Sequence, residues 1–88
     1  MFLKVRLSKG AVGGAKTIYL DVLADRPTAL LGRKVDPITL DDGSYTRADG
    51  TMVDVKHLIV KEAIAWVQPM REDRVYGHLV PDGPRRKP

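Results

Sequence analysis

The sequence predicts a small, mostly β domain: an SH3-like or Sm-like barrel of five or six short antiparallel strands. Three observations support this prediction. Hydrophobic and polar residues alternate over several short segments, as in strands with one buried face. Turn signals containing glycine or proline separate these segments at intervals of about 8 to 15 residues. The chain has 88 residues, which is enough for one domain with one core.

The first two expected strands cover residues 3–7 and 17–23, where every second residue is hydrophobic. Because side chains alternate across a strand, one face of each strand should be buried and the other exposed. The exposed face of the first strand then carries Lys4 and Arg6. The glycine-rich loop between these strands should form the tip of a hairpin.

Prolines and Asp-Gly turn signals divide the middle of the chain. Pro27 begins a new element, because proline fixes φ and lacks an N–H. A strand is expected over 30–35, with Gly32 marking a bulge or a close backbone approach. Further short strands are expected over 38–40 and 51–56.

Residues 57–70 fit two patterns, and the choice decides whether the domain is mostly β or α+β. One helix near 55–68 would gather the hydrophobic residues of this segment on one face and would end at Pro69. A strand would instead place Ile64 and Trp66 on one face and Val67 on the other. The density of Ile, Trp and Val favours the strand, and the helix stays open as the alternative.

The last expected strand covers residues 74–80, and we expect a single domain over 1–81. A Pro-Asp-Gly-Pro sequence marks the end of the ordered domain. Residues 82–88 form a basic tail that we expect to be flexible.

The composition limits the setting in which the protein works. The chain has no cysteine, which excludes disulfides and cysteine-based zinc sites. No hydrophobic run approaches the roughly 20 residues of a membrane-spanning helix, so no membrane contact is predicted. The N-terminal segment lacks the hydrophobic stretch of a signal peptide. We therefore expect a protein of the cytoplasm or of a virion interior, not a secreted one.

The positive charge is concentrated in the tail. The chain has 15 basic and 11 acidic residues, a formal charge of +4. Arg85, Arg86 and Lys87 supply three of these charges, and without them the balance is 12 against 11, or +1. This distribution weakens the case that the folded part is by itself a nucleic-acid-binding surface.

Residues 10–17 resemble a Walker A loop, G-x-x-x-x-G-K-[ST], which binds nucleotide phosphates. Lys16 and Thr17 match its last two positions, but Ala15 stands where the motif requires its second glycine. The residues after Thr17 alternate as a strand, whereas the motif needs a helix N-terminus there. We therefore interpret the segment as a flexible hairpin tip.

No catalytic or metal-binding pattern is found in the sequence. His57 and His78 are the only histidines, and nothing at the spacing of metal ligands singles them out. The aspartates do not match a calcium-binding loop and are interpreted as turn residues. Serine occurs only at Ser8 and Ser44, so no Ser–His–Asp triad can be argued. We expect no enzyme and predict no metal or cofactor.

Two sets of residues are candidates for contact with a partner. Aromatic side chains can anchor an interface or stack on bases, and these are Trp66, Tyr19, Tyr45 and Tyr76. Basic side chains can contact phosphates or an acidic partner, and these are Lys4, Arg6, Arg33, Lys34, Arg85, Arg86 and Lys87. For Trp66 the alternative is a core position beside Ile64 and Val67.

The expected function is that of a non-enzymatic interaction or assembly module, such as an accessory or structural protein of a phage or mobile element. Small size and open strand edges favour homo-oligomerisation or docking on a larger complex. The alternative is a nucleic-acid-binding barrel with a regulatory role, whose affinity should fall with salt and with removal of the tail. A nucleotide-sequestering protein is less favoured, because few residues offer phosphate ligands.

Overall fold

The computed structural model describes residues 1–39, 45–47, 56–75 and 79–88, and most of these residues lie in β-strands. The described part contains one short 3₁₀ turn and no α-helix, so the prediction of a mostly β domain is confirmed. Within these ranges, no helix has the length and the hydrophobicity that crossing a membrane would require.

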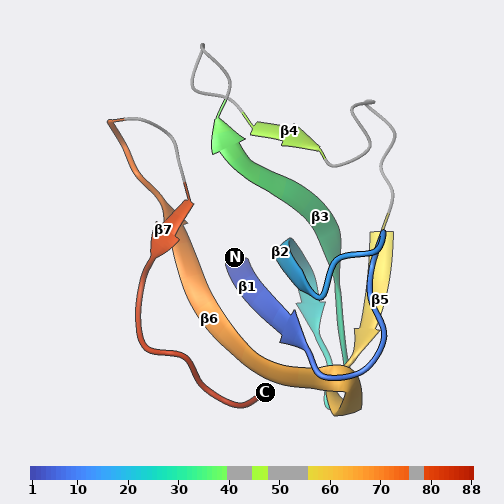
Figure 1. The fold of residues 1–88 in the computed structure, drawn as a ribbon. Coiled ribbons are helices and arrows are strands. Elements are labelled where there is room, and N and C mark those ends of the chain that lie inside the picture. Colours follow the sequence, from blue (N-terminus) through green and yellow to red (C-terminus); the bar gives the residue numbers. More distant parts are fainter. Residues whose placement is uncertain (40–44, 48–55, 76–78) are drawn as a thin grey trace.

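The strands form one antiparallel sheet (Figure 1). They are β1 (Phe2–Leu7), β2 (Thr17–Asp25), β3 (Ala29–Thr39), β4 (Tyr45–Arg47), β5 (Lys56–Val60), β6 (Ile64–Glu72) and β7 (Leu79–Pro81). The strand order is β4-β3-β2-β1-β6-β7, and β5 pairs with β3 on the same edge as β4. The 3₁₀ turn η1 (Lys61–Ala63) connects β5 to β6.

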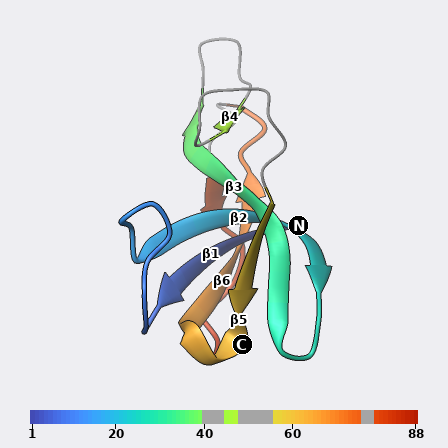
Figure 2. The same cartoon turned by 90° about the vertical axis from the view of Figure 1, so that its right-hand side faces the viewer.

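The sheet is strongly curved. β5 and β6 lie at opposite ends of the path β5-β3-β2-β1-β6, yet only η1 separates them in the chain (Figures 1 and 2). The Lys61 N–H donates to the Thr28 carbonyl at 2.9 Å, and the Ser8 N–H donates to the Ala63 carbonyl at 2.8 Å. These bonds tie η1 to the turn before β3 and to the residue that follows β1. No ladder joins β5 to β6 among the described strands, so the sheet is open and the predicted barrel is not confirmed.

The inner side of the curved sheet holds the hydrophobic core. Its buried members come from β1, β2, β3, β5 and β6, and they are Leu3, Val5, Leu7, Ile18, Leu20, Leu30, Ile59, Ile64 and Val67. Val5 and Leu20 are fully buried. Burying such a side chain contributes about 1.5–3 kcal/mol, so this alternation provides the main driving force for the fold.

Residues 56–72 form two strands separated by η1, which confirms the strand interpretation and makes the helix alternative wrong. The expected orientation of the second strand is also wrong. Arg6 lies opposite Trp66 and Leu7 lies opposite Ile64, so Ala65 is an extra residue that forms a β-bulge. The bulge turns Ile64 toward the core and Trp66 toward the outer face, where Trp66 is only half-buried.

Gly32 is buried in β3 at a close approach of two strands, as its sequence position predicts. A Cβ at this residue would lie 2.5 Å from the Asp21 carbonyl oxygen and 2.8 Å from Leu20 Cγ. The β2–β3 register shifts beside it, between Val22 and Ala24. Glycine is therefore required here because β2 leaves no room for a side chain.

The loop between β1 and β2 ends in a tight turn. Val12 and Ala15 exchange two backbone hydrogen bonds, each of 3.0 Å. Gly13 and Gly14 between them have φ values of 57° and 80°. Positive φ at both central residues defines a type I′ turn, the preferred connection of a two-residue hairpin. The interpretation of this segment as a hairpin tip is therefore confirmed.

The type I′ geometry predicts how substitutions at Gly13 and Gly14 change the free energy of unfolding. Replacing Gly13 and Gly14 by Ala-Ala should cost about 1 kcal/mol for each residue, because alanine is strained at positive φ. The pair Asn-Gly tolerates this turn and should retain the stability of the original chain. Chemical denaturation measures both free energies of unfolding. Equal stability of the Ala-Ala variant and the original chain would contradict the type I′ geometry.

The tail continues β7 along the outer edge of β6. Arg86 and Val67 exchange backbone hydrogen bonds of 2.9 and 2.8 Å, and the Asp82 N–H donates to the Pro69 carbonyl at 2.9 Å. Within β7, Pro81 lies opposite Met70. The tail therefore has a defined place beside β6, while its expected flexibility remains a prediction.

Candidate binding face

Five side chains from β1, β2, β6 and the tail define what we call the cation–aromatic face: Lys4, Arg6, Tyr19, Trp66 and Arg85. The register of the sheet brings four of them together. Lys4 lies opposite Tyr19 in β2, and Arg6 lies opposite Trp66 in β6. Directly opposite side chains project from the same side of a sheet, so these residues share the outer face.

The cations of this face lie over its aromatic rings. Lys4 Nζ is 5.8 Å from the centroid of the Tyr19 ring and 5.9 Å from that of the Trp66 ring. Arg85 Cζ is 4.5 Å from the Trp66 ring centroid. Each such cation–π contact contributes about 0.5–1 kcal/mol at an exposed site. These contacts fix positive charge and aromatic surface in one place.

Arg6 extends the positive charge of the face toward β2. Its Nη1 donates a hydrogen bond to Thr17 Oγ1 at 2.8 Å. A guanidinium carries five N–H donors, so this bond orients the group and still leaves donors for an anion. Thr17 therefore acts as a positioning residue for Arg6.

The path of the tail explains why Arg85 reaches Trp66. Gln68, which lies opposite Lys4, donates from Nε2 to the Gly83 carbonyl at 3.1 Å and so anchors the tail beside β6. Arg86, the next residue after Arg85, pairs with Val67 and lines a pocket. The two arginines of the tail therefore differ in position: Arg85 belongs to the cation–aromatic face, and Arg86 does not.

Sequence reasoning did not find Gln68 or Thr17, although the alternation of β2 and β6 contains a signal for both. Gln68 follows Trp66 by two residues, and Thr17 precedes Tyr19 by two. Residues two apart on a strand share a face. Polar residues at this distance from the aromatic candidates could therefore have been included in the site.

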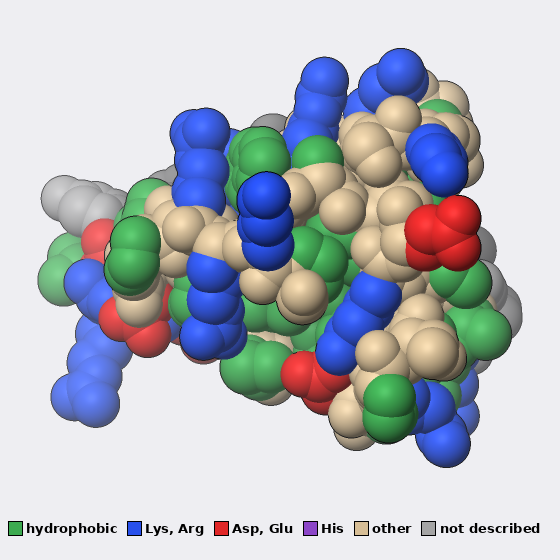
Figure 3. Space-filling model, turned by 90° about the horizontal axis from the view of Figure 1, so that it is seen from below, with side chains coloured by type: hydrophobic (Ala, Val, Ile, Leu, Met, Phe, Trp, Pro, Cys, Tyr) green, Lys and Arg blue, Asp and Glu red, His purple; other side chains and the backbone are tan. Residues whose placement is uncertain are grey.

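Asp21 is an acidic residue of the outer face, and it lies next to positive groups. Asp21 lies opposite Arg33 in register, and its Oδ1 is 3.6 Å from the N-terminal nitrogen. The view from below shows Lys and Arg side chains predominating over Asp and Glu, with hydrophobic side chains exposed between them (Figure 3). The molecule thus presents positive charge beside exposed hydrophobic surface.

Other predicted contact residues lie elsewhere. Lys34 is opposite the core residue Leu20, which places it on the inner side of the sheet, away from Lys4. Tyr45 pairs with Thr39 at the β3–β4 ladder, and its side chain lies outside the described part of the structure. Tyr76 lies outside the described residues altogether, as does His78.

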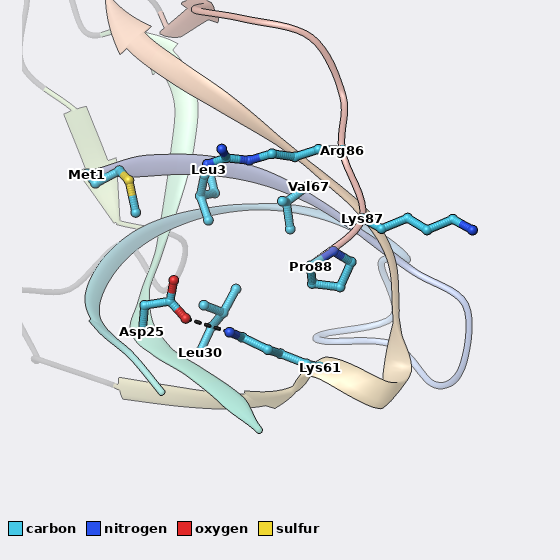
Figure 4. Close-up of a pocket in the computed structure, with 9 residues that line it drawn as sticks. All are labelled: Met1, Leu3, Asp25, Leu30, Lys61, Val67, Arg86, Lys87 and Pro88. Carbon is cyan, nitrogen blue, oxygen red and sulfur yellow. Dashed lines mark ion pairs between the residues drawn. The ribbon is translucent and has the colours of Figure 1, made fainter. Parts of the chain in front are cut away.

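A pocket of about 310 Å³ opens on the inner side of the sheet (Figure 4). The core residues Leu3, Leu30 and Val67 contribute to its walls. Lys61 Nζ lies 2.7 Å from Asp25 Oδ1, and Arg86 and Lys87 also line the pocket. The volume is at the lower end of the range of ligand pockets. We therefore rank the pocket below the cation–aromatic face as a candidate site.

The described residues contain no cluster of three or more His, Cys, Asp or Glu side chains that could hold a metal ion. His57 lies in β5 opposite Gly32. In the Walker-like loop, the Val12 and Ala15 amides bond to each other's carbonyls, so they are not directed at a phosphate. This geometry supports the rejection of the loop as a nucleotide site.

Comparisons of the chain with protein-family models, with curated proteins and with solved structures found no match.

Proposed function

We propose that this protein is a non-enzymatic interaction module that binds single-stranded nucleic acid through the cation–aromatic face. The observation that carries the proposal is the placement of Lys4 between Tyr19 and Trp66, with Arg85 over the same tryptophan. Proteins that bind single strands combine positive charge along the backbone with aromatic rings on which bases stack. This face combines both properties within three adjacent strands.

Each group of the face has a defined role in this proposal. Lys4, Arg6 and Arg85 contact phosphates, Tyr19 accepts a base, and Trp66 accepts a base in exchange for its contact with Arg85. Stacking contributes about 1–3 kcal/mol for each base, and it requires bases that are not already paired in a duplex. A single strand is therefore the favoured ligand over double-stranded DNA.

We further propose that the curved sheet is an open barrel of the SH3-like or Sm-like type. It is supported by the curvature that brings the two ends of the strand path together at η1. Small barrels of this kind commonly bind oligonucleotides on an exposed strand face. The position of the cation–aromatic face on β6, β1 and β2 agrees with that arrangement.

Trp66 provides a direct test, because it is the only tryptophan in the chain. A base that stacks on Trp66 should quench its fluorescence during titration with a single-stranded oligonucleotide at low salt. The affinity should fall as salt rises, by about 0.7 logarithmic units per logarithmic unit of salt for each phosphate contact. Unchanged fluorescence together with unchanged oligonucleotide anisotropy at low salt would contradict the proposed function.

Arg85 and Arg86 form a matched pair for a second prediction. The substitution Arg85→Met should weaken oligonucleotide binding about tenfold, because it removes one charged hydrogen-bonding group from the face. Arg86→Met removes the same charge but lies against Val67 and should change the affinity less than threefold. Fluorescence anisotropy at constant salt measures both. An equal loss in the two variants would show that only the net charge of the tail matters.

Assembly through protein contacts is the second candidate function, and the exposed hydrophobic residues of β5 favour it. A module of this kind would serve as an accessory or structural protein of a phage or mobile element, in the cytoplasm or inside a virion. Homo-oligomerisation and docking on a larger complex both remain part of this proposal.

A further inference from the structure

The edge of β5 that faces away from β3, here called the β5 edge, carries exposed hydrophobic side chains. Leu58 is 62% exposed and Val60 is 52% exposed, whereas Ile59 between them is 7% exposed and packs into the core. Natural edge strands are usually protected by proline, by inward-pointing charge or by a covering element. The three central residues Leu58, Ile59 and Val60 provide no such charge or proline.

The hydrogen-bond pattern shows which backbone groups face outward on β5. The Lys61 N–H donates to the Thr28 carbonyl, which places this pair at a hydrogen-bonded position of the β3–β5 ladder. Hydrogen-bonded and non-hydrogen-bonded pairs alternate in an antiparallel ladder. The amides and carbonyls of Leu58 and Val60 therefore point away from β3, toward the β5 edge.

We infer that the β5 edge pairs antiparallel with the β5 edge of a second copy of this chain, with Leu58 of one copy opposite Val60 of the other. This inference deepens the assembly candidate of the proposed function and rests on it. Two-fold symmetry repeats the Leu58–Val60 contact, so each exposed hydrophobic residue covers another. Both residues present outward amides and carbonyls, as a new ladder requires.

Charge complementarity selects this register and this partner. With Leu58 opposite Val60, each Lys56 is directed toward the end of the ladder where Glu62 of the second copy lies. Both residues are exposed; the Glu62 side chain is 84% exposed, and its Oε1 also lies 3.5 Å from Lys9 Nζ of the same chain. A register with Leu58 opposite itself would instead place Lys56 opposite Val60, leaving a cation against a hydrophobic side chain. A second copy therefore supplies matching hydrophobic and charged groups at once.

Sedimentation equilibrium and light scattering over a concentration series test the pairing. We expect a monomer–dimer equilibrium in the original chain. The double substitution Leu58→Ser and Val60→Ser should raise the dissociation constant at least tenfold. Val75→Ser is the matched control, because Val75 is 78% exposed but lies outside β5, and it should leave the constant unchanged. A strict monomer at high concentration would overturn the inference.

Introduced cysteines test the register, since the chain has no cysteine of its own. Leu58→Cys and Val60→Cys chains, mixed and oxidised, should form a disulfide-linked heterodimer in excess over either homodimer. Residues opposite each other at a hydrogen-bonded position have Cα atoms about 5.5 Å apart, within the range that a disulfide spans. Predominance of the Leu58→Cys homodimer, or absence of any cross-link, would overturn the inference.

The two proposed surfaces can fail separately. The Leu58→Ser and Val60→Ser chain leaves every residue of the cation–aromatic face in place, and circular dichroism checks that it remains folded. Its oligonucleotide affinity should stay within threefold of the original. If this chain is monomeric and still quenches its Trp66 fluorescence with oligonucleotide, dimerisation is assigned to the β5 edge. If neither chain dimerises, the inference fails while the nucleic-acid proposal stands on its own titration.

Discussion

The substitution Gly32→Ala should destabilise the protein by about 3 kcal/mol, because it forces a side chain into a filled space. The new Cβ would lie 2.5 Å from the Asp21 carbonyl oxygen, and backbone in a paired strand cannot easily move. It would also press on Leu20, which is fully buried in the core. Chemical denaturation should show a lower midpoint. The effect is large because the total free energy of unfolding of a small domain is only about 5–15 kcal/mol.

Gly10→Ala is the matched control for this prediction. Gly10 has a φ of 72°, and a Cβ there would meet nothing within 4 Å. Its replacement should cost only the strain of a positive φ, about 1–2 kcal/mol. A Gly32→Ala chain that is as stable as the Gly10→Ala chain would contradict the close approach of β2 and β3.

The largest expected effect on binding comes from neutralising Lys4 and Arg6 together. The chain with Lys4→Met and Arg6→Met should bind single-stranded oligonucleotide about 100-fold more weakly at low salt, tenfold for each charged contact. The dependence of log affinity on log salt should become shallower by about 1.4, because two phosphate contacts are lost. Methionine at position 4 preserves a hydrophobic stem against Tyr19 and Trp66.

Arg26→Met provides the control for general charge effects. Arg26 is exposed in the turn between β2 and β3, outside the cation–aromatic face. Its loss removes a positive charge but should leave the slope of the salt dependence unchanged. If the double variant and the control have the same slope, the phosphate contacts are not made by Lys4 and Arg6.

Local alternation was sufficient to predict the strands that contain no bulged residue of their own. In β1 the residues Leu3, Val5 and Leu7 are all buried, as their spacing requires. The orientation of Trp66 could not be predicted in this way. It depends on the bulge at Ala65, and a bulge is a property of two paired strands, so the sequence of one strand does not reveal it.

The candidate site shows the same division between local and long-range information. Lys4, Arg6 and Tyr19 were expected on exposed strand faces, and the β1–β2 pairing brings Lys4 and Tyr19 together. The meeting of Arg85 with Trp66 joins residues 19 positions apart through the path of the tail. No periodicity encodes that contact, because the tail is held mainly by backbone bonds to β6.

The position of Pro81 limits how far an assembly of this domain can grow. Because the Asp82 amide bonds to β6, alternation turns the Pro81 nitrogen outward, and proline has no hydrogen to offer a further strand. Pro81 thus protects one side of the sheet from further pairing, whereas on the other side we propose pairing through the β5 edge. A molecule that pairs through only one edge joins one partner by a single two-fold contact, and the resulting dimer has no second edge that can pair. It should form discrete pairs, and it should resist the end-to-end growth that produces fibres.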